Sequence, residues 1–236
     1  MKKTDSGRNP EEILSCLLQF VSENKRRRFE EVIRQRTRHI TVVLEDIFQP
    51  HNASAVLRTC EVFGIQDIHV IETRNRYEVN PDVALGSSKW LTLIRYGNRE
   101  NNTEECLRTL KSRGYSIIAA SPHEQGHTPE DLPLAGRVAL LFGTELEGLS
   151  ETALKMADGF VRIPMYGFTE SLNISVSAAL LIRTLTERLR HSGIPWQLRD
   201  EEMTEIRLGW ARQAVRKSSL IEKAFRGEST PDRDGK

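Results

Sequence analysis

A strand–helix–strand pattern near the start of the chain is the feature that most restricts its fold. The β-branched run Thr41–Leu44 predicts a buried strand, and Ile68–Ile71 predicts a second one. Between them, apolar residues at helical spacing from Ala53 to Phe63 predict a helix that starts with Asn52 as its N-cap and ends at Gly64. A helical crossover of this kind joins parallel strands, so we expect an α/β fold with a parallel sheet.

The same alternation of strands and helices continues far along the chain. Its further predicted strands are 91–95, 116–120, 137–142 and 160–163, and its further predicted helices are 102–113, 151–157 and 172–190. Residues 73–89 are polar and rich in turn signals, which predicts a long loop over an active face. We therefore expect one α/β domain over residues 41–191.

Both ends of the chain are expected to be helical extensions of that domain. Pro10–Arg36 reads as helical with one apolar face, and residues 201–225 read as an amphipathic helical region. The sequence 192–195 predicts a hinge, and the composition from Gly227 onward predicts disorder. The expected division is an N-terminal helical extension at 1–40, the α/β domain, and a C-terminal helical extension with its tail at 192–236.

Charge is distributed unevenly, although the formal net charge is only +1. The two extensions are basic and the central part is not, which favours ends that hold a polyanion and a middle that does chemistry. The candidate RNA-contacting residues are Lys25, Arg26, Arg27, Arg28, Arg34, Arg212, Arg216 and Lys217. The alternative is that these charges only keep two helical faces solvated.

Several functional classes find no support in the sequence. No apolar run reaches the length of a membrane span, and the N-terminus does not read as a signal peptide. Three widely spaced cysteines without a Cys-x-x-Cys pair favour reduced thiols in a cytoplasmic protein. No glycine-rich dinucleotide motif, Walker lysine motif or metal-ligand spacing is present, so we expect neither a Rossmann cofactor nor a metal.

Three segments place polar residues where predicted strands end or helices begin. They are Pro50–Thr59, Leu141–Ser150 and Ile163–Ser175. Ligands of open α/β sheets bind beyond the carboxyl ends of the strands, which is where a site is expected. Each segment also has an ordinary structural interpretation, because Gly143 and Gly148 suit plain turns. Likewise, Ser171 and Asn173 suit the cap of the following helix.

Taken together, the three segments resemble motifs of the SpoU/TrmH family of knotted SPOUT RNA methyltransferases. The motifs read Asn-x5-Arg-Thr, Phe-Gly-x-Glu-x-x-Gly and Ile-Pro-Met-x-Gly-x-x-x-Ser-Leu-Asn-x-Ser, in that order. The likeness covers roughly residues 41–190. It implies a SPOUT fold with a deep trefoil knot near the C-terminal end of the sheet, a homodimer, and S-adenosylmethionine as methyl donor.

The resemblance also implies roles for individual residues. Arg58 matches the catalytic arginine and Asn52 its motif partner, while Glu145, Ser171 and Asn173 match the other active-site positions. Positions that line the methyl-donor pocket are matched by Ala120, Gly143, Ile163 and Leu172. A guanidinium does not readily lose its proton, so we favour Arg58 as a group that binds phosphate or stabilises alkoxide charge rather than as a general base.

The tRNA member of this family modifies guanosine 18 and carries helical extensions at both ends, as this chain does. The resemblance therefore implies 2′-O-methylation of a tRNA ribose, with tRNA as partner. The alternatives are a ribosomal RNA 2′-O-methyltransferase of the same family and a non-catalytic RNA-binding protein on this fold. The run from Gly167 to Ser171 departs from the Gly-Met-Val-Gln-Ser of familiar tRNA members, and Glu170 adds a negative charge there.

Overall fold

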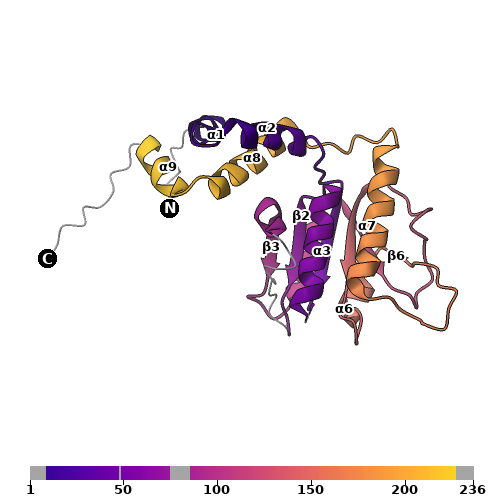
Figure 1. The fold of residues 1–236 in the computed structure, drawn as a ribbon. Coiled ribbons are helices and arrows are strands. Elements are labelled where there is room, and N and C mark those ends of the chain that lie inside the picture. Colours follow the sequence, from indigo (N-terminus) through magenta and orange to yellow (C-terminus); the bar gives the residue numbers. More distant parts are fainter. Residues whose placement is uncertain (1–8, 48, 75–85, 227–236) are drawn as a thin grey trace. The chain divides into compact units, whose positions relative to one another are not determined.

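The computed structural model describes residues 9–47, 49–74 and 86–226, which fall into two compact units. The larger unit is Arg36–Gln197, and the smaller one combines residues from the two ends of the chain. The larger unit contains a six-stranded sheet with the order β3-β2-β1-β5-β4-β6, and its strand pairs are all parallel (Figure 1). The expected α/β class with a parallel sheet is therefore confirmed.

The strands lie close to their predicted positions. They are β1 Ile40–Glu45, β2 Asp67–Ile71, β3 Thr92–Tyr96, β4 Tyr115–Ala120, β5 Arg137–Phe142 and β6 Gly159–Val161. The helices of this unit are α3 Pro50–Phe63, the 3-10 helix η1 Ser87–Trp90, α5 Asn102–Ser112, α6 Glu151–Met156 and α7 Ile174–Arg190. The last strand ends two residues before Ile163, which lies in the segment that follows it.

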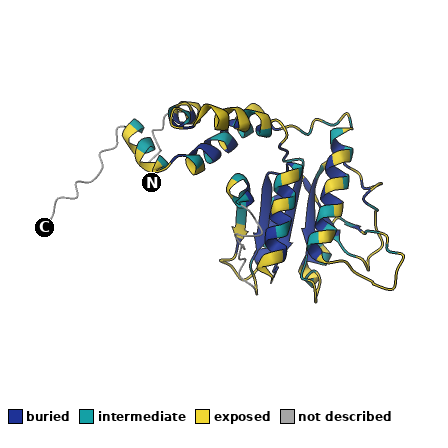
Figure 2. Cartoon of the chain, in the orientation of Figure 1, coloured by how far each residue is buried: buried dark blue, intermediate teal, exposed yellow. Residues whose placement is uncertain are grey.

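The sheet is buried on both faces, as Figure 2 shows by the dark strands behind the helices. Val42 and Leu44 of β1 belong to the core that α3 and α7 cover, whereas Val43 belongs to the core beneath α5 and α6. The alternation along β1 follows from the two-residue repeat of a strand. Such double burial explains why the strands read as continuous apolar runs.

The carboxyl ends of β1 and β5 lie side by side at the centre of the sheet. These strands pair in parallel, with Leu44 beside Phe142. The segment after β1 leads into α3, and the segment after β5 begins at Gly143. Helices α3 and α7 run next to each other over one face (Figure 1). The arrangement gathers two loops and two helix starts at one edge of the sheet.

Helix α3 begins earlier than the sequence suggested. Asn52 was predicted to be its N-cap, but the helix starts at Pro50 and the N-cap is Gln49. Proline suits the first helical position because it has no N–H to leave unbonded there. Asn52 therefore lies in the first turn of α3. The predicted end is confirmed, since Gly64 caps the helix with φ +83°.

Over residues 9–35 and 198–226, the smaller unit has four helices. They are α1 Pro10–Leu18, α2 Glu23–Ile33, α8 Asp200–Ala214 and α9 Ser218–Arg226. The helical character predicted at both ends is confirmed, and the structure adds a break after Leu18 and another after Ala214. Within the unit, the rings of Phe29 and Trp210 lie 5.4 Å apart, and Arg207 pairs with Glu30 at 2.8 Å.

Two predictions fall on parts of the chain outside the described residues. They are the disordered tail from Gly227 and residues 75–85 of the predicted 73–89 loop. Within that loop, Ser87–Trp90 forms the short helix η1. Across residues 9–47, 49–74 and 86–226, no helix has the length and apolar character needed to cross a membrane.

Burial of His69 on β2 makes the stability of the larger unit depend on pH. Burial, and after it the nearby charge of Arg113, lowers the pKa of His69 to about 4. Below pH 6.5 the unfolded chain binds a proton that the folded chain does not bind, so stability falls as pH drops from 6.5 to 4. The shift corresponds to about 3 kcal/mol. Urea unfolding at pH 7.5 and 4.5 should show this loss in the wild type, and His69→Leu should reduce the difference. Equal pH dependence in both proteins would contradict the assignment.

Candidate functional site

A tight loop after β5 forms the centre of the site. Thr144 and Gly148 exchange two backbone hydrogen bonds, at 2.9 and 3.1 Å. This closure brings the backbone of Gly148 so near Gly143 that a Cβ on Gly143 would lie 2.2 Å from the Gly148 carbonyl oxygen. Only glycine fits at position 143, so its occurrence in the motif has a steric cause. We call residues 143–150 the Gly143 loop.

Three side chains from distant parts of the sequence meet beside this loop. The Asn52 Nδ2 donates to Glu145 Oε1, and the Asn173 Nδ2 donates to the same oxygen at 3.4 Å. The Asn173 Nδ2 also lies 3.2 Å from Asn52 Oδ1, which accepts from it. The structure thus brings together three of the five predicted active-site residues, from α3, the Gly143 loop and the start of α7.

Asn173 holds this cluster and the start of α7 at the same time. Its Oδ1 accepts from the backbone N of Ser175 at 2.9 Å and from the Ser175 hydroxyl at 2.6 Å. It is the N-cap of α7, so the capping interpretation of Asn173 is correct as well. One amide therefore fixes the helix through its oxygen and Glu145 through its nitrogen.

Two carboxylates at the end of β1 hold neighbouring segments: Glu45 holds the end of the Gly143 loop, and Asp46, the residue after β1, holds the segment after β2. Glu45 is 3% exposed, and its carboxylate accepts from the hydroxyls of Thr103 and Ser150 at 2.6 and 2.7 Å and from the Ser150 backbone N at 2.9 Å. Asp46 has φ +52° and accepts from the backbone N of Thr73 and Arg74 at 2.7 and 2.8 Å. Neither residue was among the predicted site residues. The available signal was a pair of carboxylates directly after a buried strand.

A cavity of about 420 Å³ opens beside the Gly143 loop, at the carboxyl ends of β4, β5 and β6. It is lined by all four residues predicted to bind the methyl donor and by two predicted active-site residues. These six are Ala120, Gly143, Glu145, Ile163, Ser171 and Leu172. We call it the Ala120 cavity. Its walls come from three chain segments that are far apart in sequence. The fold thus brings predicted residues from all three segments to one cavity.

Arg58 does not join the cluster within its own chain. It is exposed on α3, and among the described residues it makes no hydrogen bond or ion pair. Six residues of helix separate it from Asn52, which puts it about 9 Å farther along the axis and about a third of a turn around it. Its guanidinium is thus presented to solvent on a different side of α3 from Asn52.

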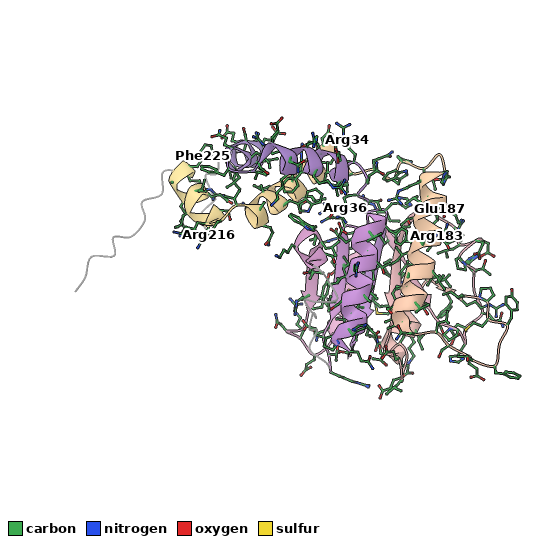
Figure 3. All side chains as sticks on the ribbon, in the orientation of Figure 1. Arg34, Arg36, Arg183, Glu187, Arg216 and Phe225 are labelled. Carbon is green, nitrogen blue, oxygen red and sulfur yellow. The ribbon has the colours of Figure 1, made fainter. Side chains whose placement is uncertain are left out.

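The basic residues predicted to contact RNA belong to the smaller unit. The four cations 25–28 and Arg34 are exposed on or just after α2, and Arg216 and Lys217 are exposed between α8 and α9. Figure 3 labels Arg34 and Arg216. Arg212 differs, because Glu222 holds it through two hydrogen bonds of 2.8 Å and these raise the pKa of Arg212.

Neither metal ligation nor disulfide formation is a feature of the described part of the chain. No group of three or more His, Cys, Asp and Glu side chains there is arranged to hold a metal ion. All three cysteines are free, and burial raises the pKa of the Cys60 thiol to about 12.

Fold and site together define an α/β protein with a cavity at the carboxyl edge of a parallel sheet, which the first residues of α7 help to line. The chain belongs to the SpoU rRNA methylase family, whose family model matches residues 39–183. Among similar proteins, the tRNA (guanosine(18)-2′-O)-methyltransferase of Borreliella burgdorferi is 45% identical over 209 residues, 89% of this chain and 94% of that protein.

Solved structures agree with the fold. The TrmH/SpoU tRNA modifying enzyme of Aquifex aeolicus matches with a TM-score of 0.73 and 27% identity, over 83% of this chain and 98% of that one. The SpoU methyltransferase AviRb of Streptomyces viridochromogenes, in complex with AdoMet, matches with a TM-score of 0.54 and 18% identity, over 69% of this chain and 62% of that one. The second likeness concerns the fold alone.

The steric role of Gly143 leads to a stability prediction. Gly143→Ala forces the Gly143 loop apart, and overpacking of this kind costs about 1–3 kcal/mol. Gly136→Ala is the matched control, because no atom lies within 4 Å of a Cβ built there. Urea unfolding should show a clear loss for Gly143→Ala and little change for Gly136→Ala. Equal stability of the two variants would contradict the steric argument.

Proposed function

We propose that this chain transfers a methyl group from S-adenosylmethionine to the ribose 2′-hydroxyl of guanosine 18 in tRNA. The observation that carries the proposal is the Asn52–Glu145–Asn173 cluster at the rim of the Ala120 cavity. The cluster supports this function because it occurs in a chain that matches nearly the full length of a relative named for this activity.

The Ala120 cavity is suited to the methyl donor. Its volume of about 420 Å³ lies within the range of small-molecule sites. Apolar side chains such as Ile163 and Leu172 stand beside backbone of the Gly143 loop, a combination that can enclose an adenine and offer it hydrogen bonds. The AviRb structure, in which a protein of this fold is in complex with AdoMet, supports S-adenosylmethionine as the methyl donor. S-adenosylmethionine supplies an electrophilic methyl group when bound.

The chain's own residues contribute mainly by positioning the ribose. A neutral thioether leaves without assistance, so the geometry of the attacking hydroxyl matters most. Of the two oxygens of the Glu145 carboxylate, only Oε1 accepts hydrogen bonds from the described residues, which leaves Oε2 to bind the ribose hydroxyl and to receive its proton as the methyl group is transferred. Ser171 lies on the rim of the same cavity and offers a further hydroxyl.

Arg58 is proposed to act on the site of a second copy of the chain. Its exposure and its distance from Asn52 along α3 place it away from its own cluster. A homodimer is supported by exposed apolar side chains at and before the start of α7, since Val176 and Leu180 on the helix are 46% and 43% exposed and Leu172, two residues before it, is 39% exposed. In the site of the second copy, the Arg58 guanidinium would bind a phosphate or stabilise the developing alkoxide.

The trefoil knot and the domain roles are part of the same proposal. Strand β6 lies at the edge of the sheet, whereas α7 packs beside α3 near its middle. The segment 162–173 must therefore return across the carboxyl ends of the strands, which supports a knotted path. The division at 1–40, 41–191 and 192–236, with basic helical ends that contact tRNA phosphates, stays a prediction. A cytoplasmic location also stays a prediction.

A labelling experiment tests the reaction and its target. The chain is incubated with methyl-labelled S-adenosylmethionine and unmodified tRNA, ribosomal RNA, or tRNA with 2′-deoxyguanosine at position 18. We expect label at guanosine 18 of the first tRNA only, because the deoxy substrate lacks the attacking oxygen. Label in ribosomal RNA alone would favour the family's other substrate. Label in the deoxy tRNA would contradict the proposed site of methylation.

The role of Arg58 can be tested by the geometry of its replacement. Arg58→Lys keeps the charge but loses the planar fork of donors, so we expect kcat to fall about 100-fold while the Kd for S-adenosylmethionine stays unchanged. Single-turnover methylation and equilibrium dialysis measure the two quantities. Near-wild-type turnover by the lysine variant would rule out a requirement for guanidinium geometry.

Mixed subunits test whether Arg58 acts across the dimer. Arg58→Ala and Asn173→Ala are each expected to be inactive, but their mixture restores one complete site in each mixed dimer. Random pairing predicts about a quarter of wild-type activity. No regained activity, with subunit exchange verified by differential tags, would place Arg58 in its own chain's site.

A further inference from the structure

A second and larger cavity lies on the other side of the Gly143 loop. Its volume is about 930 Å³, and its walls come from the carboxyl ends of β1 and β2, the start of α5, and the Gly143 loop. Residues Thr144–Leu149 line both cavities, so the loop forms a thin wall between them. We call this second space the Arg74 cavity.

The charges of the Arg74 cavity are unsuited to a phosphate. Among the described residues that line the cavity, carboxylates outnumber the single cation, Arg74. This excess of negative charge would repel an anion. The same walls carry hydroxyl, amide and guanidinium donors beside the carboxylates. A neutral group with adjacent donors and acceptors fits this chemistry, and the edge of a nucleobase is such a group.

The carboxylates differ in how firmly they are held. The carboxylates of Glu45 and Asp46 already accept hydrogen bonds within the protein, and these residues line the cavity. Glu147 pairs with Arg74, and both side chains are about 70% exposed. Exposed ion pairs contribute little to stability, so this pair can open at small cost to bind a ligand. Glu147 and Arg74 are thus the groups of the cavity best placed to recognise a base.

We propose that the Arg74 cavity binds the guanine of the methyl acceptor, with the Glu147 carboxylate accepting from N1–H and the N2 amine and Arg74 donating to O6. This inference rests on the proposed function and extends it to the choice of nucleotide. Guanine presents these donors and this acceptor side by side on its Watson–Crick edge, and adenine reverses their polarity. A carboxylate next to a guanidinium therefore selects guanine.

The position of the two cavities agrees with this assignment. The methyl donor is proposed to occupy the Ala120 cavity and the base occupies the Arg74 cavity, so the ribose lies at the wall that they share. Glu145, which lines both cavities, then stands next to the 2′-hydroxyl. RNA bases that are recognised individually are turned out of their stacks and bonded on such edges.

A tRNA with inosine at position 18 tests the assignment, since inosine lacks only the N2 amine of guanine. We expect wild-type kcat/KM to be about 10-fold lower on this tRNA. Glu147→Gln should lose about 10-fold on the guanosine tRNA and less on the inosine tRNA, because the N2 amine, one of the two donors assigned to Glu147, is already absent there while N1–H remains. The measurements are single-turnover methylation on both tRNAs and the Kd for S-adenosylmethionine, which should stay unchanged.

Glu130→Gln is the matched control, because it removes the same charge from an exposed residue that lines neither cavity. It should leave both tRNAs unaffected relative to wild type. Equal losses by Glu147→Gln on the two tRNAs, or no loss on either, would overturn the guanine site while the proposed function stands. Failure of the wild type to methylate guanosine 18 would overturn the proposed function and this inference together.

Discussion

The site depends on a backbone contact that allows no side chain. At Gly143 the chain leaves β5 and meets the backbone of Gly148 so closely that a Cβ would lie 2.2 Å from its carbonyl oxygen. This contact closes the Gly143 loop, and the closed loop holds Glu145 above the carboxyl ends of β1 and β5. Both cavities use the loop as a wall, so their shapes follow from the same contact. The polar contacts of the site therefore depend on a glycine at position 143, where no side chain fits.

The Asn52–Glu145–Asn173 cluster converts that loop into a link between two helices. Helices α3 and α7 come from distant parts of the chain, yet their first turns meet through one carboxylate oxygen. Each amide also has a local role, since Asn52 donates to Gln49 at 3.1 Å and Asn173 caps α7. Asn173 therefore fixes the start of α7 as well as the arrangement of the site, which explains why its capping interpretation and its active-site interpretation were both reasonable.

The local pattern of apolar residues was enough to predict the sheet and most helices. Buried parallel strands are continuous apolar runs, which can be recognised in the sequence. Patterns failed where backbone geometry decides the outcome. The start of α3 depends on the fixed φ of Pro50 rather than on the capping preference of Asn52. The role of Glu45 required knowing that Thr103 and Ser150 lie beside it, which is tertiary information. The residues that line the Ala120 cavity were predicted from the family motifs and not from periodicity.

The thin wall between the cavities has a thermodynamic consequence. Because Thr144–Leu149 line both cavities, a ligand that shifts this segment from one side changes the wall that a ligand on the other side meets. By linkage, each ligand then changes the affinity of the other by the same factor. Cooperativity between donor and acceptor would arise in this protein from six shared residues, without any movement of helices.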